Sequence, residues 1–305
     1  MIVNKEALCY KQEKNKIRCY LCPHNCLISE GNTGICKVRE VQWDNDKLKL
    51  FSINYGEITS IALDPIEKKP LYNFSPGNNI LSIGSFGCNF RCSFCQNYSI
   101  SQYKADSRYV SPEEMCDIIL RTENSIGVAF TYNEPSIWYE YVFDVAKKLK
   151  KADKNKKVVL VTNGYINEEP LKELLPYIDA MNIDLKGKDE YYKKLCIGRM
   201  EPVKKSIKLA CDNNCHVEVT TLLISGENSS LETIIEIGDF IASIDKNIPL
   251  HISRYFPRYK MNSEMTNLDD MKNAYNTLKQ KLNYVYLGNL NEEEYSYIIN
   301  HITTL

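Results

Sequence analysis

From Asn79 onward, short apolar runs alternate with amphipathic helical segments, and this alternation limits what the chain can fold into. Each run is brief and mostly apolar, as expected of a strand that is buried on both faces. Seven such runs begin at Asn79, Gly127, Lys157, Ala180, His216, Pro249 and Leu282. Buried strands that alternate with helices form a parallel sheet covered by helices. We therefore predict an α/β fold with six or seven β/α units, built as a partial or complete TIM-like barrel, with a doubly wound sheet as the alternative.

Two of the intervening helices carry clear signals. Ser111-Pro-Glu-Glu114 is a capping box with proline in the first helical position. A second helix is expected to begin near Pro135, because apolar side chains recur there at every fourth position. These side chains are Ile137, Tyr141, Val145 and Leu149. The basic segment KKLKKADKNKK at the end of this helix is typical of a solvated helix end.

The first part of the chain has a different character. The segment CYLCPHNCLISEGNTGICKVRE resembles a loop, because proline and glycine interrupt it. Two short strands are expected over Leu48–Ile53 and Ile58–Leu63, with Tyr55 and Gly56 as the turn between them. We therefore predict a cysteine-rich metal-binding extension over residues 1–62 and a barrel domain over residues 63–305.

Composition places the protein among ordinary globular chains. The 305 residues are 44% hydrophobic and 25% charged, and the formal net charge is −1. This charge balance gives no reason to expect nucleic acid or an anionic membrane as a partner. The start of the chain lacks the apolar run of a signal peptide, and no later segment has the roughly 18 apolar residues of a membrane span. We therefore expect a cytoplasmic protein whose thiols stay reduced.

Twelve cysteines in such a protein favour metal or cluster binding over disulfides. Seven of them fall into two groups. The first group is Cys19, Cys22, Cys26 and Cys36, and the second is Cys88, Cys92 and Cys95. The other five are expected to be small buried hydrophobic residues, although Cys9 has no evident role.

The second group supplies three thiolates, in the spacing C-x3-C-x2-C, directly after the first strand of the alternating region. A structural zinc site or a fully ligated [4Fe–4S] cluster needs four ligands. A cubane with three cysteines leaves one iron with open positions, which a small molecule with adjacent amine and carboxylate groups can chelate. S-adenosylmethionine has that pair of groups, together with a sulfonium that accepts an electron.

Polar side chains follow the predicted strands at one end of the sheet, as catalytic groups do in a barrel. The second strand ends in TYNEP, the third in Thr162-Asn163-Gly164 and the fourth in Asp184-Leu185-Lys186. The fifth strand carries Glu218 and Thr220. Each motif alone has an ordinary structural explanation, such as a turn or a helix cap. Together they predict the rim of one site.

With these motifs in this order, the chain resembles the radical S-adenosylmethionine (radical SAM) superfamily. The resemblance implies that Cys88, Cys92 and Cys95 ligate a [4Fe–4S] cluster and that Phe94 packs near the adenine. It implies that Asn133 and Glu134 stand where the family contacts the methionine amine. The remaining positions that resemble cofactor-binding residues are Thr162, Asn163, Asp184, Lys186 and Thr220, with Lys186 suited to the methionine carboxylate.

The resemblance narrows to the pyruvate formate-lyase activating-enzyme-like group, and within it to the AmmeMemoRadiSam-system family. The segments LDPIEKKPLYNFSPG, VTTLLISGEN and HISRYFPRYKM carry the match, together with the cysteine-rich extension. Such proteins are expected to end in a C-P-x-C-G segment after YVYLGN. Here the chain continues as LNEEEYSYIINHITTL, without cysteine, which departs from that pattern.

The four cysteines of the extension form a closed ligand set with the spacing C-x2-C-x3-C-x9-C. A structural zinc ion and a second [4Fe–4S] cluster both remain open. Zinc prefers two knuckles, and only Cys19 and Cys22 form one. In activating enzymes, by resemblance, ferredoxin-like inserts follow the first cluster motif, whereas this group precedes it. His24 is an alternative ligand, although a single loop histidine is usually part of the polar surface.

Three hypotheses for function follow. The first is a radical SAM enzyme that abstracts hydrogen from an unidentified substrate, small molecule or protein, with an electron donor such as flavodoxin or ferredoxin as partner. The second is an activase that installs a glycyl radical on another enzyme. The third is a non-catalytic iron–sulfur protein for electron transfer or sensing, which leaves the strand-end residues unexplained. No catalytic residue can be assigned, and Arg199, Arg254, Tyr255 and Tyr259 are candidates for substrate contacts or for simple packing.

Overall fold

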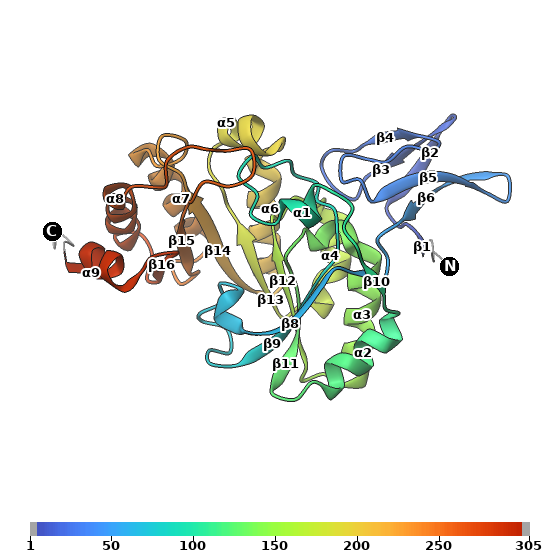
Figure 1. The fold of residues 1–305 in the computed structure, drawn as a ribbon, viewed down its shortest axis with the longest axis horizontal. Helices are drawn as coiled ribbons and strands as arrows, with labels where there is room; N and C mark the ends of the chain where they lie inside the picture. The colour runs from blue at the N-terminus through green and yellow to red at the C-terminus, as the bar shows by residue number, and fades with distance from the viewer. Residues whose placement is uncertain (1–4, 301–305) are drawn as a thin grey trace.

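Eight strands form the central sheet of the protein in the computed structural model, which describes residues 5–300 (Figure 1). The strands are β8 (Ser60–Pro65), β9 (Asn79–Gly84), β11 (Ser125–Phe130), β12 (Lys157–Thr162), β13 (Ala180–Asp184), β14 (His216–Leu223), β15 (Leu250–Arg254) and β16 (Val285–Gly288). Neighbouring strands from β9 to β16 pair in parallel, and β8 pairs antiparallel with β9 at one edge. All seven predicted strands of the alternating region are confirmed.

The spatial order of the parallel strands follows the chain order, β9 to β16, without a reversal. A doubly wound sheet reverses its strand order at a switch point, so that alternative is wrong. Within the described residues, the edge strands β8 and β16 do not pair with each other, and the sheet is a partial barrel.

Helices connect the strands and cover the outer face of the sheet (Figure 1). The α-helices are α1 (Tyr98–Ser101), α2 (Pro112–Arg121), α3 (Tyr139–Ala152), α4 (Glu168–Leu174), α5 (Asp189–Tyr191), α6 (Met200–Asp212), α7 (Leu231–Ile244), α8 (Leu268–Lys279) and α9 (Glu292–Asn300). Short helical turns are η1 (Ile66–Lys68), η2 (Pro135–Trp138), η3 (Leu175–Tyr177) and η4 (Tyr192–Cys196), the last with π-helical hydrogen bonding.

Both predicted helix signals are confirmed. The Ser111 hydroxyl accepts a hydrogen bond from the backbone N–H of Glu114 at 3.1 Å, so it caps α2. The helix expected near Pro135 begins there as the turn η2 and continues as α3. The four side chains of its apolar stripe are all buried, which places this face of the helix against the core.

The amino-terminal extension contains more strand than the sequence indicates. Two small antiparallel sheets are present, and their strands are β1 (Lys5–Glu6), β2 (Tyr10–Glu13), β3 (Lys16–Cys19), β4 (Leu27–Ser29), β5 (Arg39–Asp44) and β6 (Lys47–Ser52). The strands expected over Leu48–Ile53 and Ile58–Leu63 do not form a hairpin, because β6 pairs with β5 and β8 pairs with β9. Gly56 lies between β6 and β8, where the chain leaves the extension, and its φ is +76°. The next strand, β7 (Glu57–Ile58), pairs with β10 (Arg108–Tyr109).

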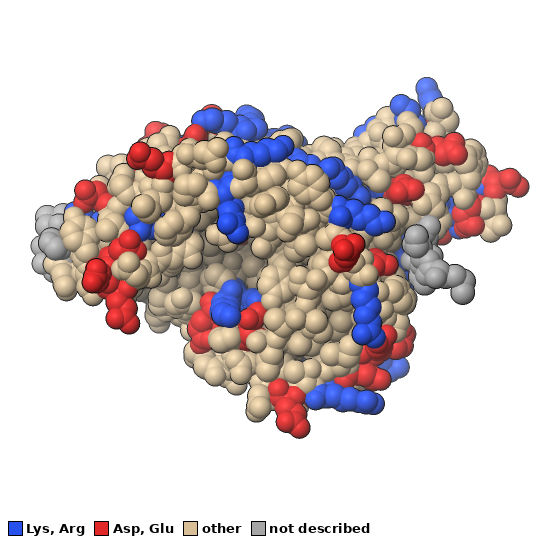
Figure 2. Space-filling model, viewed as in Figure 1, with Lys and Arg blue, Asp and Glu red and all other residues tan. Residues whose placement is uncertain are grey.

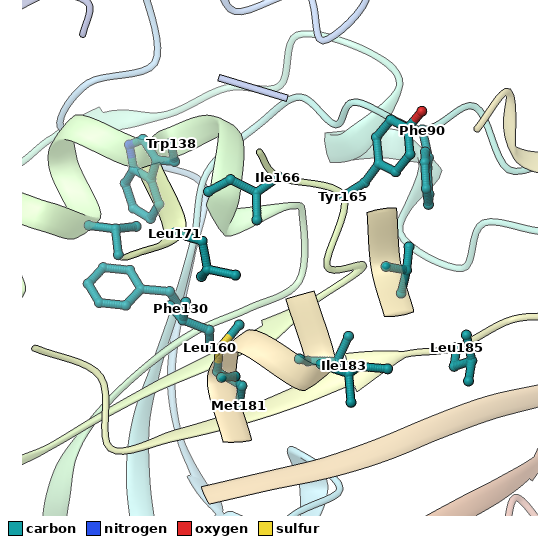
Figure 3. Close-up of a cluster of buried hydrophobic side chains, with 14 of the residues drawn as sticks. Phe90, Phe130, Trp138, Leu160, Tyr165, Ile166, Leu171, Met181, Ile183 and Leu185 are labelled. Atoms are coloured by element: carbon teal, nitrogen blue, oxygen red, sulfur yellow. The ribbon is translucent and has the colours of Figure 1, made fainter. Parts of the chain in front are cut away.

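The core is packed from the sheet and the helices that cover it (Figure 3). Phe130, Leu160 and Met181, from three neighbouring strands, pack in the same cluster as Trp138 and Leu171. A second buried layer comprises Ile66, Leu71, Ile80, Ala129, Val159 and Ala180. Side chains alternate between the two faces of a strand, so Thr131, Val161 and Asp184 share the face of this layer, nearer the carboxyl ends.

A buried ion pair connects the extension to the barrel. The Arg39 guanidinium on β5 lies 2.7 Å from the Glu140 carboxylate on α3, and both side chains are 1% exposed. Glu140 also accepts a hydrogen bond from the backbone N–H of Leu8 at 2.7 Å. Among the described residues, no helix has the length and apolar character needed to cross a membrane.

Candidate active site

The carboxyl ends of the parallel strands surround one cavity of about 440 Å³. Figure 2 shows the molecular face hollowed between α1 and the connection from β8 to β9. All eleven predicted cluster and cofactor residues of the barrel line this cavity: Cys88, Cys92, Cys95, Phe94, Asn133, Glu134, Thr162, Asn163, Asp184, Lys186 and Thr220. Residues from the cysteine loop and from four strands, β11 to β14, thus meet at one place.

The three cysteines lie on the loop that follows β9. Cys92 is buried, and Cys88 and Cys95 are partly exposed. The Cys88 sulfur accepts a hydrogen bond from the backbone N–H of Phe90 at 3.3 Å and lies 3.7 Å from the Asn163 Nδ2. Burial raises the pKa of the Cys88 thiol well above its ordinary value. Free thiols in this loop are therefore protonated near neutral pH, and metal binding is what would ionise them.

The arrangement of the thiols fits a multinuclear cluster better than a single ion. Within residues 5–300, no three His, Cys, Asp or Glu side chains are grouped closely enough to hold one metal ion. In a cubane each thiolate binds a different iron, so three thiols around a larger cavity are the expected arrangement. The residues present therefore fit a [4Fe–4S] cluster with one iron free of cysteine.

Neighbouring segments hold the cysteine loop in place. The Asn133 amide donates to the carbonyl oxygens of Phe86 and Gly87, at 3.3 and 3.1 Å. The Gln102 amide donates to the Phe90 carbonyl at 3.1 Å. The backbone N–H of Arg91 donates to the carbonyl of Cys196 at the end of η4, at 2.9 Å. The loop is thus supported from β11, α1 and η4.

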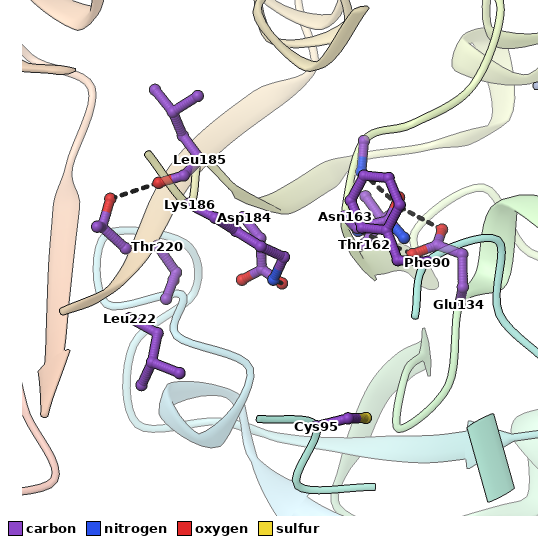
Figure 4. A network of polar contacts seen from close by, with 12 residues as sticks. Phe90, Cys95, Glu134, Thr162, Asn163, Asp184, Leu185, Lys186, Thr220 and Leu222 are labelled. Atoms are coloured by element: carbon purple, nitrogen blue, oxygen red, sulfur yellow. Dashed lines mark hydrogen bonds and ion pairs between the residues drawn. The ribbon is translucent and has the colours of Figure 1, made fainter. Parts of the chain in front are cut away.

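Glu134 forms one wall of the cavity (Figure 4). Its carboxylate accepts hydrogen bonds from the Thr162 hydroxyl at 2.5 Å and from the backbone N–H groups of Asn163 and Ser136 at 2.8 and 2.9 Å. Burial raises the pKa of Glu134, while these hydrogen bonds favour its charged form. An oriented, buried carboxylate of this kind is suited to a primary amine.

Asp184 and Lys186 form the opposite wall (Figure 4). The Lys186 ammonium donates to the Asp184 carboxylate at 2.7 Å and lies 5.8 Å from the centre of the Phe94 ring. Burial would lower the pKa of Lys186, but Asp184 keeps it well above the ordinary value. The ammonium is therefore charged, and the cavity presents a carboxylate on one wall and an ammonium on the other.

Thr220 lies on β14, and its hydroxyl already donates to the Asn182 side chain at 2.9 Å.

The structure also brings to the cavity a hydrogen-bond network that was not predicted from the sequence. Lys69 donates to Asp64 at 2.9 Å, and the Tyr132 hydroxyl donates to the same carboxylate at 2.9 Å. Both Lys69 and Tyr132 line the cavity. Asp64 and Lys69 lie in the segment LDPIEKKP and Tyr132 lies in TYNEP, but no chemistry was attached to these three residues.

The four candidate substrate residues do not line this cavity. Arg254 is buried and donates to Glu294 and to the Thr266 carbonyl, at 2.6 and 2.7 Å. Tyr255 is buried, and Tyr259 stacks on Tyr98 with ring centres 4.7 Å apart. Arg199 instead lines a larger cavity of about 1010 Å³ between the extension and the barrel. That cavity contains none of the predicted cofactor residues.

Comparison with known proteins agrees with this geometry. Residues 82–241 match the model of the radical SAM superfamily. The chain belongs to the radical SAM superfamily. It is 38% identical over 307 residues to an uncharacterized protein of Methanocaldococcus jannaschii, covering 97% of this chain and 89% of that protein. It is 26% identical over 170 residues to the pyruvate formate-lyase-activating enzyme of Staphylococcus epidermidis, covering 52% of this chain and 67% of that enzyme.

The radical SAM fold is also seen in solved structures. Streptococcus suis SuiB bound to S-adenosylmethionine matches with a TM-score of 0.53 at 17% identity, over 71% of this chain and 53% of that chain. The relatives confirm an enzyme of the pyruvate formate-lyase activating-enzyme-like group, and the family implies a [4Fe–4S] cluster and S-adenosylmethionine. The narrower AmmeMemoRadiSam assignment and the role of each site residue stay predictions.

Proposed function

We propose that the protein is a radical SAM enzyme that abstracts hydrogen from a substrate still to be identified. When bound, the reduced cluster supplies one electron that cleaves S-adenosylmethionine into methionine and a 5′-deoxyadenosyl radical. The observation that carries the proposal is the convergence of three thiols, a buried carboxylate and a buried ammonium on one cavity. This set suits a cluster together with the amine and carboxylate of one ligand.

The roles of the residues follow from their chemistry. Cys88, Cys92 and Cys95 would hold the cluster and leave one iron open. Glu134, with Thr162 and Asn163 fixing its orientation, would accept the methionine amine. Lys186, held by Asp184, would donate to the methionine carboxylate. Phe94 would pack against the adenine, while Asn133 positions the loop and Thr220 lines the floor.

The proposal also includes the domain organisation, the electron donor and the cellular compartment of the enzyme. Residues 1–62 would be a metal-binding extension and residues 63–305 the catalytic barrel. A low-potential donor such as flavodoxin or ferredoxin would supply the electron, and the cytoplasm would keep the twelve thiols reduced. The AmmeMemoRadiSam-system family remains the narrower assignment, supported by the sequence segments that resemble it.

Anaerobic reconstitution followed by dithionite and S-adenosylmethionine tests the central step. Wild-type protein should form 5′-deoxyadenosine, and the Cys92→Ala variant should form none. S-adenosylmethionine should also shift the EPR spectrum of the reduced cluster. A full, reducible cluster whose spectrum does not respond to S-adenosylmethionine would contradict the proposal, even if turnover requires the true substrate.

A second candidate, a glycyl-radical-enzyme activase, is favoured by the similarity to the pyruvate formate-lyase-activating enzyme. Incubation with candidate partner enzymes should then produce the EPR doublet of a glycyl radical. A protein that cleaves S-adenosylmethionine but yields no doublet with any candidate would favour a different substrate.

A further inference from the structure

The connection between β8 and β9 supplies part of the active-site cavity that the proposed cofactor site does not use. Lys68 ends the short turn η1 in this connection, and Lys69 and Pro70 follow it. All three residues line the same cavity as Glu134 and Lys186. Figure 2 shows Lys or Arg atoms at the edge of the hollow, over this connection. The cavity therefore has a cationic part that the binding of S-adenosylmethionine leaves unassigned.

Lys69 is buried, and its charge is incompletely compensated. Its side chain is 4% exposed, and its ammonium lies 2.9 Å from the Asp64 carboxylate. The same carboxylate accepts hydrogen bonds from the Lys68 ammonium at 3.2 Å and from the Tyr132 hydroxyl at 2.9 Å. Among the described residues, Asp64 is the one hydrogen-bond acceptor of the Lys69 ammonium, which has three N–H donors. Two ammonium groups therefore share one carboxylate, and the group is cationic when both lysines are protonated.

The pKa values agree with this imbalance. Burial would raise the pKa of Asp64, but hydrogen bonds from Lys69 and Tyr132 hold it well below its ordinary value. Asp64 is therefore ionised at neutral pH. Burial lowers the pKa of Lys69, and the hydrogen bond to Asp64 offsets this effect only in part. A second anion beside Lys69 would stabilise its charged form.

The other charged residues of the cavity leave this part without an opposing acid. Among the described residues, the charged side chains that line the cavity are Lys68, Lys69, Glu134, Asp184 and Lys186. In the proposed function, Glu134 and Lys186 bind the amine and the carboxylate of the cofactor, and Asp184 holds Lys186. An ammonium that is buried without a full set of partners is unfavourable. The two remaining lysines therefore favour an anion as the second ligand of the cavity.

The backbone of Tyr132 holds the lysine network in place. Its φ is +70°, a left-handed conformation that is unusual for an aromatic residue. The Asn97 amide donates to the Tyr132 carbonyl at 2.7 Å, and the Lys69 ammonium lies 4.9 Å from the centre of the Tyr132 ring. Strained residues of this kind cluster at ligand-binding sites, where the surrounding contacts fix them. Because Tyr132 directly precedes Asn133 and Glu134, one segment reaches both the lysine network and the proposed amine-binding carboxylate.

We propose that Lys69, together with Lys68, binds an anionic oxygen group, a carboxylate or a phosphate, of a small-molecule substrate. This assignment rests on the proposed radical SAM function and names the class of substrate that enters the cavity. The anionic group anchors the substrate, and the hydrogen to be abstracted lies elsewhere in the same molecule. A backbone glycine carries no charge and has no use for such an anchor. The lysines therefore favour a small molecule over a glycyl-radical enzyme as the substrate.

Anion binding to the reconstituted protein tests the assignment. Saturating S-adenosylmethionine is present, so that Lys186 is occupied. Inorganic phosphate and malonate are titrated separately, at an ionic strength held constant with sodium chloride, and the temperature of thermal unfolding is measured. At least one anion should raise this temperature in wild type in a saturable way. A rise with phosphate alone indicates a phosphate-bearing substrate, and a rise with malonate alone indicates a carboxylate.

Three variants locate the bound anion. Lys69→Met should weaken binding at least tenfold, because a hydrogen bond to a charged group is lost, while Asp64 keeps Lys68 and Tyr132 as partners. Lys68→Met changes a side chain that is 67% exposed and should weaken binding roughly two- to fivefold. Lys172→Met, on the exposed surface of α4, should bind the anion as wild type does.

No saturable rise in wild type, or equal affinities in wild type and Lys69→Met, would overturn the anion site. If Lys69→Met does not fold, unchanged affinity in Lys68→Met would overturn it instead. The anion site and the radical SAM function also fail in different ways. A reduced cluster whose EPR spectrum responds to S-adenosylmethionine, in a protein that binds neither anion, removes the anion site alone. Anion binding that depends on Lys69, in a protein whose cluster ignores S-adenosylmethionine, removes the proposed function alone.

Discussion

Buried charged side chains line the candidate active site of this protein. A buried charge is unfavourable unless a partner or a hydrogen bond compensates it. Glu134 and Lys186 have such partners at the cavity wall, and each also faces the cavity, where a ligand of opposite charge can bind. Their chemical types were foreseeable from the strand-end motifs. The hydrogen-bond partners of Glu134 could not be predicted from the sequence. Thr162, Asn163 and Ser136 reach its carboxylate only because the fold places them beside it.

Glu134→Gln should weaken the binding of S-adenosylmethionine. The amide loses the charge that attracts the amine and can no longer accept with both oxygens. Loss of one hydrogen bond to a charged group costs about 1.5–3 kcal/mol, which corresponds to roughly a 10- to 100-fold increase in Kd. Equilibrium binding to the reconstituted protein measures this, with Glu169→Gln on the exposed surface as the control. Unchanged binding by Glu134→Gln would remove Glu134 from the cofactor site.

Glu218 predicts a pH dependence of stability. Burial would raise the pKa of Glu218, but hydrogen bonds from His216, His251 and two backbone N–H groups lower it to about 2. Its folded pKa lies below its ordinary 4.5, so its stabilisation is present above pH 4.5 and is lost as pH falls toward 2.

Glu218→Gln should therefore lower the free energy of unfolding by on the order of 2–3 kcal/mol at pH 7. The difference from wild type should shrink as pH falls below 4.5. Urea unfolding at pH 7 and pH 4 measures it. A difference that stays constant or grows between these pH values would contradict the assigned hydrogen bonds.

At the scale of whole elements, prediction succeeded where the sequence pattern is periodic. The seven parallel strands are short apolar runs, and periodicity finds these without knowledge of their neighbours. It failed in the extension, where β3 (Lys16–Cys19) and β4 (Leu27–Ser29) flank a short segment with two cysteines and a proline. Such short antiparallel strands are stabilised by their pairing and by the packing of side chains such as Ile17 and Ile28, neither of which appears in a local pattern.

The π-helical turn η4 had no signal in the sequence. It ends at Cys196, and the φ of +61° at the following residue, Ile197, is unusual for a β-branched side chain. The next residue, Gly198, packs against Phe90 of the cysteine loop, and a Cβ there would clash with the Phe90 ring. Because η4 also accepts hydrogen bonds from Arg91 and Ser93, this turn acts as a support for the cysteine loop.

Gly198→Ala should disturb that support. The added methyl group would displace Phe90, and overpacking of this kind costs about 1–3 kcal/mol. The variant should unfold at lower urea concentration and lose iron more readily. Ile197→Gly is the matched control, because it relieves the strained φ without touching Phe90, and it should be neutral or more stable by up to about 1 kcal/mol. Equal loss of stability in both variants would argue against the contact with Phe90 as the cause.

At the scale of the whole molecule, the site could be assembled from the sequence because every motif lies at the end of a parallel strand. Barrel topology then brings Cys88, Glu134 and Lys186 together, although 46 to 98 positions separate Cys88 from the other two. What could not be predicted is how the extension joins the barrel. The partners Arg39 and Glu140 are 101 positions apart, and no local pattern at either residue predicts their pairing.

The Arg39–Glu140 pair should be important for joining the two parts. Arg39→Met leaves Glu140 buried without its partner, and breaking a buried pair in this way costs about 3–5 kcal/mol. The double change Arg39→Met with Glu140→Met should recover much of that loss, because no uncompensated charge remains. Urea unfolding of both variants measures the effect. A double variant as unstable as the single one would show that packing, not charge, dominates this contact.

The separation of Arg39 from Glu140 also has a consequence for how the protein is made. A ribosome adds about 5–20 residues per second, so Arg39 is synthesised roughly 5–20 s before its partner. During that interval the extension has no α3 to pack against, and its four thiols have left the ribosome before the barrel cysteines. We expect the extension to complete its packing only after α3 has been synthesised, and its four thiols to stay accessible until then.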